Sequence, residues 1–169
     1  MIEKIREVRE AVKNKTYIAA LALALTLPDI CGQVENGASE SNKSYYIHWI
    51  DKYMDNEAFS FPLDGFDTQT FKGNMCYSLR CKLLHSGNVD VKSKRLGVDV
   101  DEFILVKPDS PQYYHGFQYK TVRLSDGTEK KTTIIGVDYL CEVLCSTAED
   151  YYNKHPNKAL FDEHTFDFE

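Results

Sequence analysis

Apolar positions in the first part of the chain recur at helical intervals. Residues 2–14 carry an apolar stripe separated by charged residues, the pattern of an amphipathic helix. Residues 17–31, YIAALALALTLPDIC, are apolar on nearly every side, which predicts a helix at the centre of the fold. Thr26 and Asp29 have the spacing of a capping box and Pro28 suits a first helical turn, so another helix is expected to begin there. The stripe of the first helix is Ile2, Ile5, Val8 and Val12.

Two more helices are predicted after a polar loop at residues 33–44. Residues 45–54, YYIHWIDKYM, place apolar side chains at helical spacing, and His48 is expected to face solvent. A further helix is predicted from about Thr70 to His85, with Gly87 as the glycine that ends it.

The pattern changes after residue 100. Residues 102–107, 117–124 and 129–136 have the composition of strands, and the Asp126-Gly127 pair between the last two is a strong hairpin signal. These segments predict a small antiparallel sheet. Asp138 is then expected to cap a last helix that ends before Pro156.

The predicted fold is mainly α. It is a four- or five-helix bundle with a small antiparallel β insertion at about residues 102–136, before the last helix. A chain of 169 residues suits one domain, here residues 1–155. The acidic, aromatic tail at 156–169 either packs loosely or binds a partner.

Charge is distributed unevenly along the chain. The net charge of -6 argues against a protein that coats nucleic acid nonspecifically. Residues 71–97 nevertheless hold six Lys and Arg against one Asp, a local charge of +5 (6 minus 1). The Lys and Arg side chains of this window either keep a loop solvated or form a local basic site.

Cysteine usage and hydropathy indicate a cytoplasmic protein that does not span a membrane. The five cysteines include no C-x-x-C pair. We therefore expect them to be small, buried apolar residues of a protein in a reducing compartment. A zinc site from Cys76, Cys81, Cys141 and Cys145 would have unusual spacing, so no metal is expected. The apolar run is too short for a bilayer and contains Pro28 and Asp29. No cofactor-binding motif is present, so no cofactor is expected.

The candidate chemistry lies in CYSLRCKLLHSGN, residues 76–88, where His85 follows Arg80 by five positions. Five residues of α-helix rotate by about 500°, so the two side chains are about 140° apart on a regular helix. They can act together only if the helix end is distorted or if a second chain contributes.

Arg80 and His85 have the side chains that metal-free RNA cleavage requires. A histidine near a helix C-terminus titrates near neutrality and moves protons, and the arginine fork holds a phosphate. Tyr77 lies three residues before Arg80 and is expected to orient it, while Lys82 adds positive charge. Asp29 has two interpretations: it belongs to the capping box, or it is a buried carboxylate that pairs with Arg80.

The CYSLRCKLLHSGN stretch, together with YIAALALALTLPDICG, resembles the HEPN superfamily and a group of small bacterial proteins. The mark of that superfamily is an Arg followed four to six residues later by a His, and the resemblance covers roughly the first ninety residues. It implies a helical homodimer in which Arg80 and His85 of two chains line one cleft. It also implies a metal-independent endoribonuclease of a toxin or phage-defence type.

Three hypotheses stay open at this point. The first is the ribonuclease. The second is a HEPN-like module that binds a protein or nucleotide without turnover, because active members often have Asn, Asp or His directly after the arginine and this chain has Cys81. In the third, Arg80 and His85 have purely structural roles.

Overall fold

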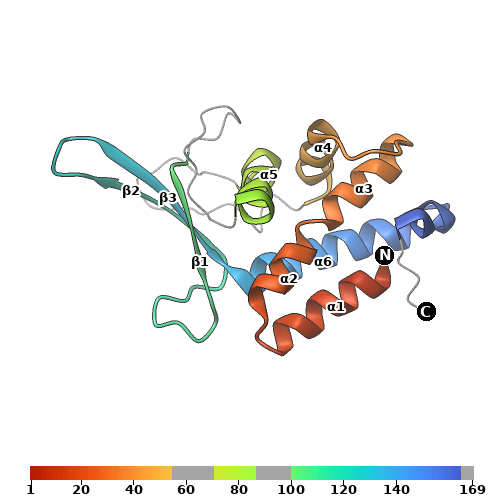
Figure 1. Ribbon diagram of the computed structural model, residues 1–169, viewed down its shortest axis with the longest axis horizontal. Coiled ribbons are helices and arrows are strands. Elements are labelled where there is room, and N and C mark those ends of the chain that lie inside the picture. The colour runs from red at the N-terminus through yellow and green to blue at the C-terminus, as the bar shows by residue number, and fades with distance from the viewer. Residues whose placement is uncertain (55–70, 87–99, 165–169) are drawn as a thin grey trace. The chain divides into compact units, whose positions relative to one another are not determined.

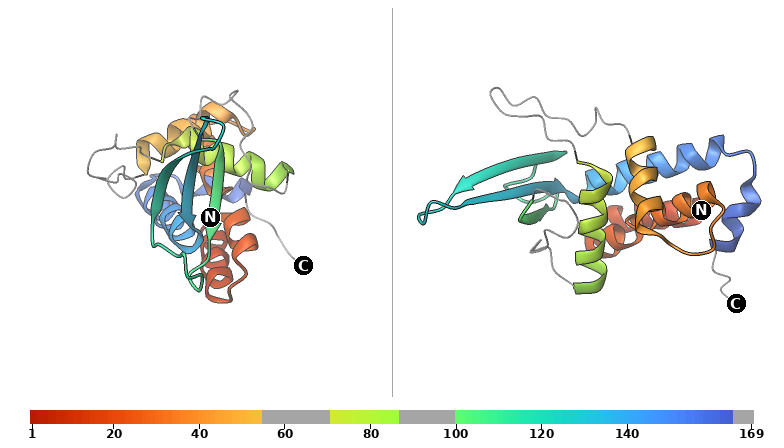
Figure 2. Two further views of the ribbon diagram at one scale, coloured as in Figure 1. Left: turned by 90° about the vertical axis from the view of Figure 1, so that its left-hand side faces the viewer. Right: turned by 90° about the horizontal axis from the view of Figure 1, so that it is seen from above.

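The computed structural model describes residues 1–54, 71–86 and 100–164. Contacts within the chain define two compact units. The first consists of Met1–Met54 and Cys141–Glu169, and the second of Asp55–Leu140. The prediction of a single domain stays a prediction. Figures 1 and 2 show the elements of each unit.

The first unit is helical. Its buried side chains come from every helix and include Ile5, Val8, Leu21, Trp49 and Leu144. A short 3-10 helix, Lys158–His164, buries Phe161 and so extends the packed structure into the predicted tail. The α-helices are α1 (Ile2–Lys13), α2 (Tyr17–Ala24), α3 (Leu27–Asn36), α4 (Lys43–Tyr53) and the larger part of α6 (Val137–Lys154).

The apolar run divides into two helices of unequal burial. α2 leaves Ile18 77% exposed, so it is not enclosed on all sides as predicted. α3, by contrast, buries every residue from Leu27 to Val34. The helical stretch Tyr17–Asn36 is long and apolar enough to cross a membrane, but 67% of it is buried inside the structure, as a core helix would be.

The predicted caps occupy the right positions but make different hydrogen bonds. Thr16 and Thr26 precede α2 and α3, yet their hydroxyls donate backwards, to the carbonyls of Ala11 and Leu23. Each threonine directly follows another helix, whose last carbonyls lack helical partners and attract the hydroxyl. The capping-box prediction is therefore wrong in its bonding, although it located the start of α3.

Helices α3 and α4 approach closely at Gly32. A Cβ atom placed on Gly32 would lie 2.9 Å from the carbonyl oxygen of Tyr45. Because the obstructing atom belongs to the backbone of α4, no side-chain rotation can relieve the contact. The glycine therefore sets how closely the two helices pack.

We predict that Gly32→Ala destabilises the protein by about 1–3 kcal/mol, the usual range for overpacking. A glycine-to-alanine change inside a helix otherwise stabilises it by roughly 0.5–1 kcal/mol, so the expected sign is opposite to the propensity effect. Urea unfolding of both proteins measures the difference. An equal or higher unfolding free energy for Gly32→Ala would contradict the close approach.

The second unit contains a three-stranded sheet and one helix. The strands are β1 (Glu102–Val106), β2 (Phe117–Arg123) and β3 (Glu129–Gly136), in the order β1-β3-β2. β2 and β3 form the predicted antiparallel hairpin, but β1 pairs with β3 in parallel, so the sheet is mixed and the antiparallel prediction is wrong for β1. The turn residues fix only the hairpin, and no local turn sets the direction of β1.

Helix α5 (Gly73–Cys81) follows Phe71, whose ring stacks on Phe117 with centroids 4.5 Å apart. Phe71 also contacts Phe103 edge to face, so aromatic rings from two strands meet the segment that begins α5.

The described residues contain six α-helices instead of the predicted four or five.

Candidate functional site

Arg80 and His85 lie at a distorted helix end. Arg80 is in the last turn of α5, and the chain then winds as a π-helix from Lys82 to Ser86. A π-helix closes hydrogen bonds between residues five apart, so each residue rotates by less than in an α-helix. The angular separation of Arg80 and His85 around the helix axis is therefore smaller than the 140° of a regular helix. A distorted helix end was one of the two conditions under which Arg80 and His85 could act together.

The side chains around Arg80 are partly accessible. The guanidinium lies over the ring of Tyr77, with the Arg80 Cζ atom 5.7 Å from the ring centroid. This distance lies within the range of a cation–π contact, and the role of Tyr77 in orienting Arg80 stays a prediction. His85 is exposed, while Arg80, Cys81 and Lys82 are half-buried. The helix thus offers an accessible arginine and histidine with a lysine between them.

Asp29 belongs to the first unit and Arg80 to the second, so their pairing stays a prediction. Asp29 is 8% exposed and accepts a hydrogen bond from the Ser41 hydroxyl at 2.5 Å. This bond ties the first turn of α3 to the loop before α4.

A second group of polar side chains was missed by the sequence analysis. The Tyr113 hydroxyl lies 2.8 Å and 3.0 Å from the two carboxylate oxygens of Asp138, and 2.7 Å from Nδ1 of His115. An ionised carboxylate has no proton to give, so Tyr113 donates to Asp138. His115 Nδ1 must then be the donor to Tyr113. When His115 is neutral, this arrangement leaves the lone pair on Nε2.

The backbone holds this group in place. A Cβ atom on Gly136 would lie 2.7 Å from the carbonyl oxygen of Tyr114, so the glycine permits the 113–116 segment to approach the end of β3. The Gly136 N–H donates to the Gly116 carbonyl at 2.9 Å. The ring of His115 also packs edge to face on Tyr139, with centroids 4.8 Å apart. His115 is nevertheless 66% exposed, so Nε2 is accessible from solvent.

Sequence reasoning gave Asp138 only a role at the start of the last helix. It lies inside the first turn of α6, which begins at Val137, and so does not precede the helix as a capping residue would; its partner Tyr113 is 25 residues away in the chain. No spacing rule connects Tyr113, His115 and Asp138, because only the folded connection between β1 and β2 brings them together.

We predict that Tyr113→Phe lowers the population of the Nδ1–H tautomer of His115, because Nδ1 loses its acceptor. Nitrogen-15 NMR of the imidazole measures the tautomer. Tyr114→Phe is the matched control, since it removes a neighbouring hydroxyl outside this hydrogen-bond chain. An unchanged His115 tautomer in Tyr113→Phe would contradict the proposed direction of the bonds.

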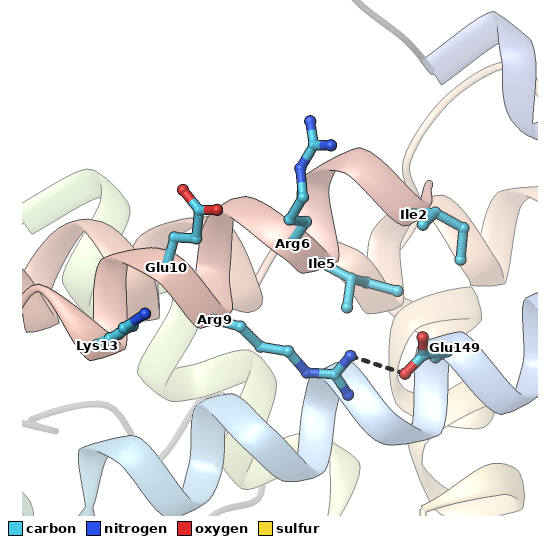
Figure 3. A pocket seen from close by; sticks show the side chains of 7 residues that line it. All are labelled: Ile2, Ile5, Arg6, Arg9, Glu10, Lys13 and Glu149. Carbon is cyan, nitrogen blue, oxygen red and sulfur yellow. Dashed lines mark ion pairs between the residues drawn. The ribbon is translucent and has the colours of Figure 1, made fainter.

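An open groove of about 390 Å³ runs along α1 in the first unit (Figure 3). Arg9 lies at its edge and bonds Glu142 at 2.9 Å and Glu149 at 2.9 Å, which holds α1 against α6. The Glu142 hydrogen bonds hold the pKa of Arg9 above its usual range. Arg6 points away from this ion pair in Figure 3. Arg9 is thus engaged in packing, and Arg6, which also lines the groove, pairs with Glu3, so we assign the groove no catalytic role.

Glu35 joins an aromatic cluster in the same unit. It accepts hydrogen bonds from Lys52 and, at 2.9 Å, from the Tyr53 hydroxyl. Three rings pack together here, with centroids 4.9–5.6 Å apart: those of Trp49, Tyr53 and Tyr151. This spacing leaves no room for a ligand among the rings. Trp49 and Tyr151 belong to the core, whereas Tyr53 is 36% exposed at its edge.

Among the described residues, no group of three or more His, Cys, Asp and Glu is arranged to hold a metal ion. Burial raises the pKa of the Cys145 thiol to about 12 and also raises the pKa of Cys31. Cys81 is half-buried, whereas the other four cysteines are buried.

Comparison with models of protein families finds no match for this chain, and comparisons with curated proteins and with solved structures find none either.

Proposed function

We propose that the protein is a metal-independent endoribonuclease in which Arg80 and His85 act on RNA as a homodimer. The observation that carries the proposal is the π-helical turn Lys82–Ser86, which begins between the two residues and reduces their angular separation. Single π-turns occur frequently at functional sites. The cation–π contact that positions Arg80 over Tyr77 adds support.

The chemistry follows from the side chains. His85 of one copy takes the proton of a ribose 2′-hydroxyl, whose oxygen forms a bond to the adjacent phosphorus. Arg80 stabilises the charge on the phosphate oxygens as the bond to the 5′-oxygen breaks. His85 of the second copy, in its protonated form, gives a proton to that 5′-oxygen. The products are a 2′,3′-cyclic phosphate and a 5′-hydroxyl.

We expect His85→Ala and Arg80→Ala each to lower the cleavage rate by roughly 10²–10⁴-fold, the usual contribution of a proton-transfer or charge-stabilising group. The assay follows a labelled RNA in the presence of a chelator. His48→Ala is the matched control, because His48 is also exposed on a helix and has no assigned role.

Circular dichroism verifies that each variant is folded. Cleavage that survives in both Arg80→Ala and His85→Ala would refute the catalytic assignment.

The alternative is a non-catalytic module that binds a protein or a nucleotide, here tested as RNA, through the same surface. It is favoured by the half-buried Cys81 in the position directly after Arg80. A thiol is a weak hydrogen-bond donor and contributes little to phosphate binding. Cys81 also provides a probe of this surface, because the other four cysteines are buried.

We predict that RNA slows alkylation of Cys81 by iodoacetamide severalfold in the His85→Ala protein, since bound RNA would cover the thiol. Mass spectrometry of the cysteine peptides measures the rate, and Arg80→Ala/His85→Ala is the control with weakened binding. Protection combined with no turnover by the natural sequence would favour the non-catalytic module. Equal alkylation rates with and without RNA would argue against both forms of the proposal.

A further inference from the structure

The β2–β3 hairpin is longer than the sheet that supports it. β1 pairs with β3 only between Thr132 and Gly136, whereas β2 remains paired with β3 as far as Arg123 and Glu129. Figure 1 shows the hairpin continuing past the end of β1. We call residues Lys120–Lys131 the arm.

The arm contributes little to the core. Ten consecutive residues, Lys120–Glu129, are exposed, including Val122 at 50% and Leu124 at 44%. A two-stranded hairpin by itself is marginally stable in water. Its turn is nonetheless well built: Gly127 adopts a φ of 83°, and the Thr128 N–H donates to the Asp126 carboxylate at 2.9 Å. An ordered ribbon that buries so little surface is suited to contact a partner.

Positive side chains lie on both faces of the arm. The register places Lys120, Val122 and Lys130 on one face, and Arg123 and Lys131 on the other. The arm contains four Lys and Arg against Asp126 and Glu129, a charge of +2 (4 minus 2) in a chain of net charge -6. Lys130 pairs with Glu102 at 2.8 Å. Within the described part of the chain, no ion pair holds Lys120 or Arg123.

We propose that the arm binds the two phosphate backbones of a base-paired RNA stem. This inference rests on the proposed action on RNA and extends it to a class of substrate. Cations on opposite faces of a ribbon match phosphates on both of its sides, whereas a single strand would engage one face. The wide, shallow minor groove of A-form RNA presents two backbones and the 2′-hydroxyls to such an element. Cleavage through a 2′-hydroxyl also requires a flexible linkage, so the substrate is a stem with an adjoining loop.

The test measures binding of a fluorescein-labelled stem-loop RNA to the full-length His85→Ala protein, which does not cleave it. Lys120→Ala/Arg123→Ala removes one cation from each face. We expect its affinity for the stem-loop to fall by roughly fivefold to fiftyfold, as for the loss of two charge-assisted contacts. The slope of log affinity against log salt should become shallower by about 1.8. The preference of the Lys120→Ala/Arg123→Ala protein for the stem-loop over a single-stranded RNA of the same composition should fall as well.

Lys13→Ala/Lys43→Ala is the matched control, because it removes the same charge from exposed positions of the first unit. It should leave the affinity and the salt slope nearly unchanged. Equal affinity of the arm variant and its parent would overturn the arm inference alone and leave the ribonuclease proposal standing. Equal losses in the arm and control variants would also overturn it, since net charge would then explain the effect. If the parent protein binds neither RNA, both proposals fail.

Discussion

The stacking of Phe71 on Phe117 is the contact on which the second unit depends. Phe71 precedes α5, which carries Arg80, and Phe117 begins β2, which leads into the arm. Phe117 also packs edge to face on Tyr139, whose ring supports His115. This series of aromatic contacts therefore supports three polar features, namely the helix that carries Arg80, the strand that leads into the arm, and His115. Phe71 and Phe117 are 3% and 2% exposed. Because such a buried core is closely packed, a substitution at either residue would shift all three polar features.

The polar features of the second unit differ in how they are constrained. The guanidinium of Arg80 lies over the ring of Tyr77 in the same helix, and a π-turn that contains His85 follows. His115 is positioned through a hydroxyl and a carboxylate from other segments. The arm is constrained by its turn and its ladder of hydrogen bonds, and at its base by contacts of Lys130 with Glu102 and of Lys131 with Asp101. Local geometry thus governs Arg80 and tertiary contacts govern His115, whereas the arm is supported mainly by its own strand pairing.

Much of the local structure could be predicted because it depends on neighbouring residues. The periodicity of Ile5 and Val8 predicted α1, and Asp126-Gly127 predicted the hairpin turn. The direction of β1 could not be predicted, because its pairing with β3 is determined by packing across a long connection. The hydrogen bond of the Thr26 hydroxyl was also misassigned, since the end of the preceding helix offered a competing acceptor.

The same division applies to the candidate site. The spacing of Tyr77, Arg80 and His85 is local, so it predicted that they lie on one helix and that a regular helix would separate Arg80 from His85. The π-turn that begins at Lys82, and the hydrogen bonds by which Tyr113 joins His115 to Asp138, became visible only in the folded chain. Helix winding at an end and hydrogen bonds between distant segments depend on packing against the rest of the fold, which no short window of sequence contains.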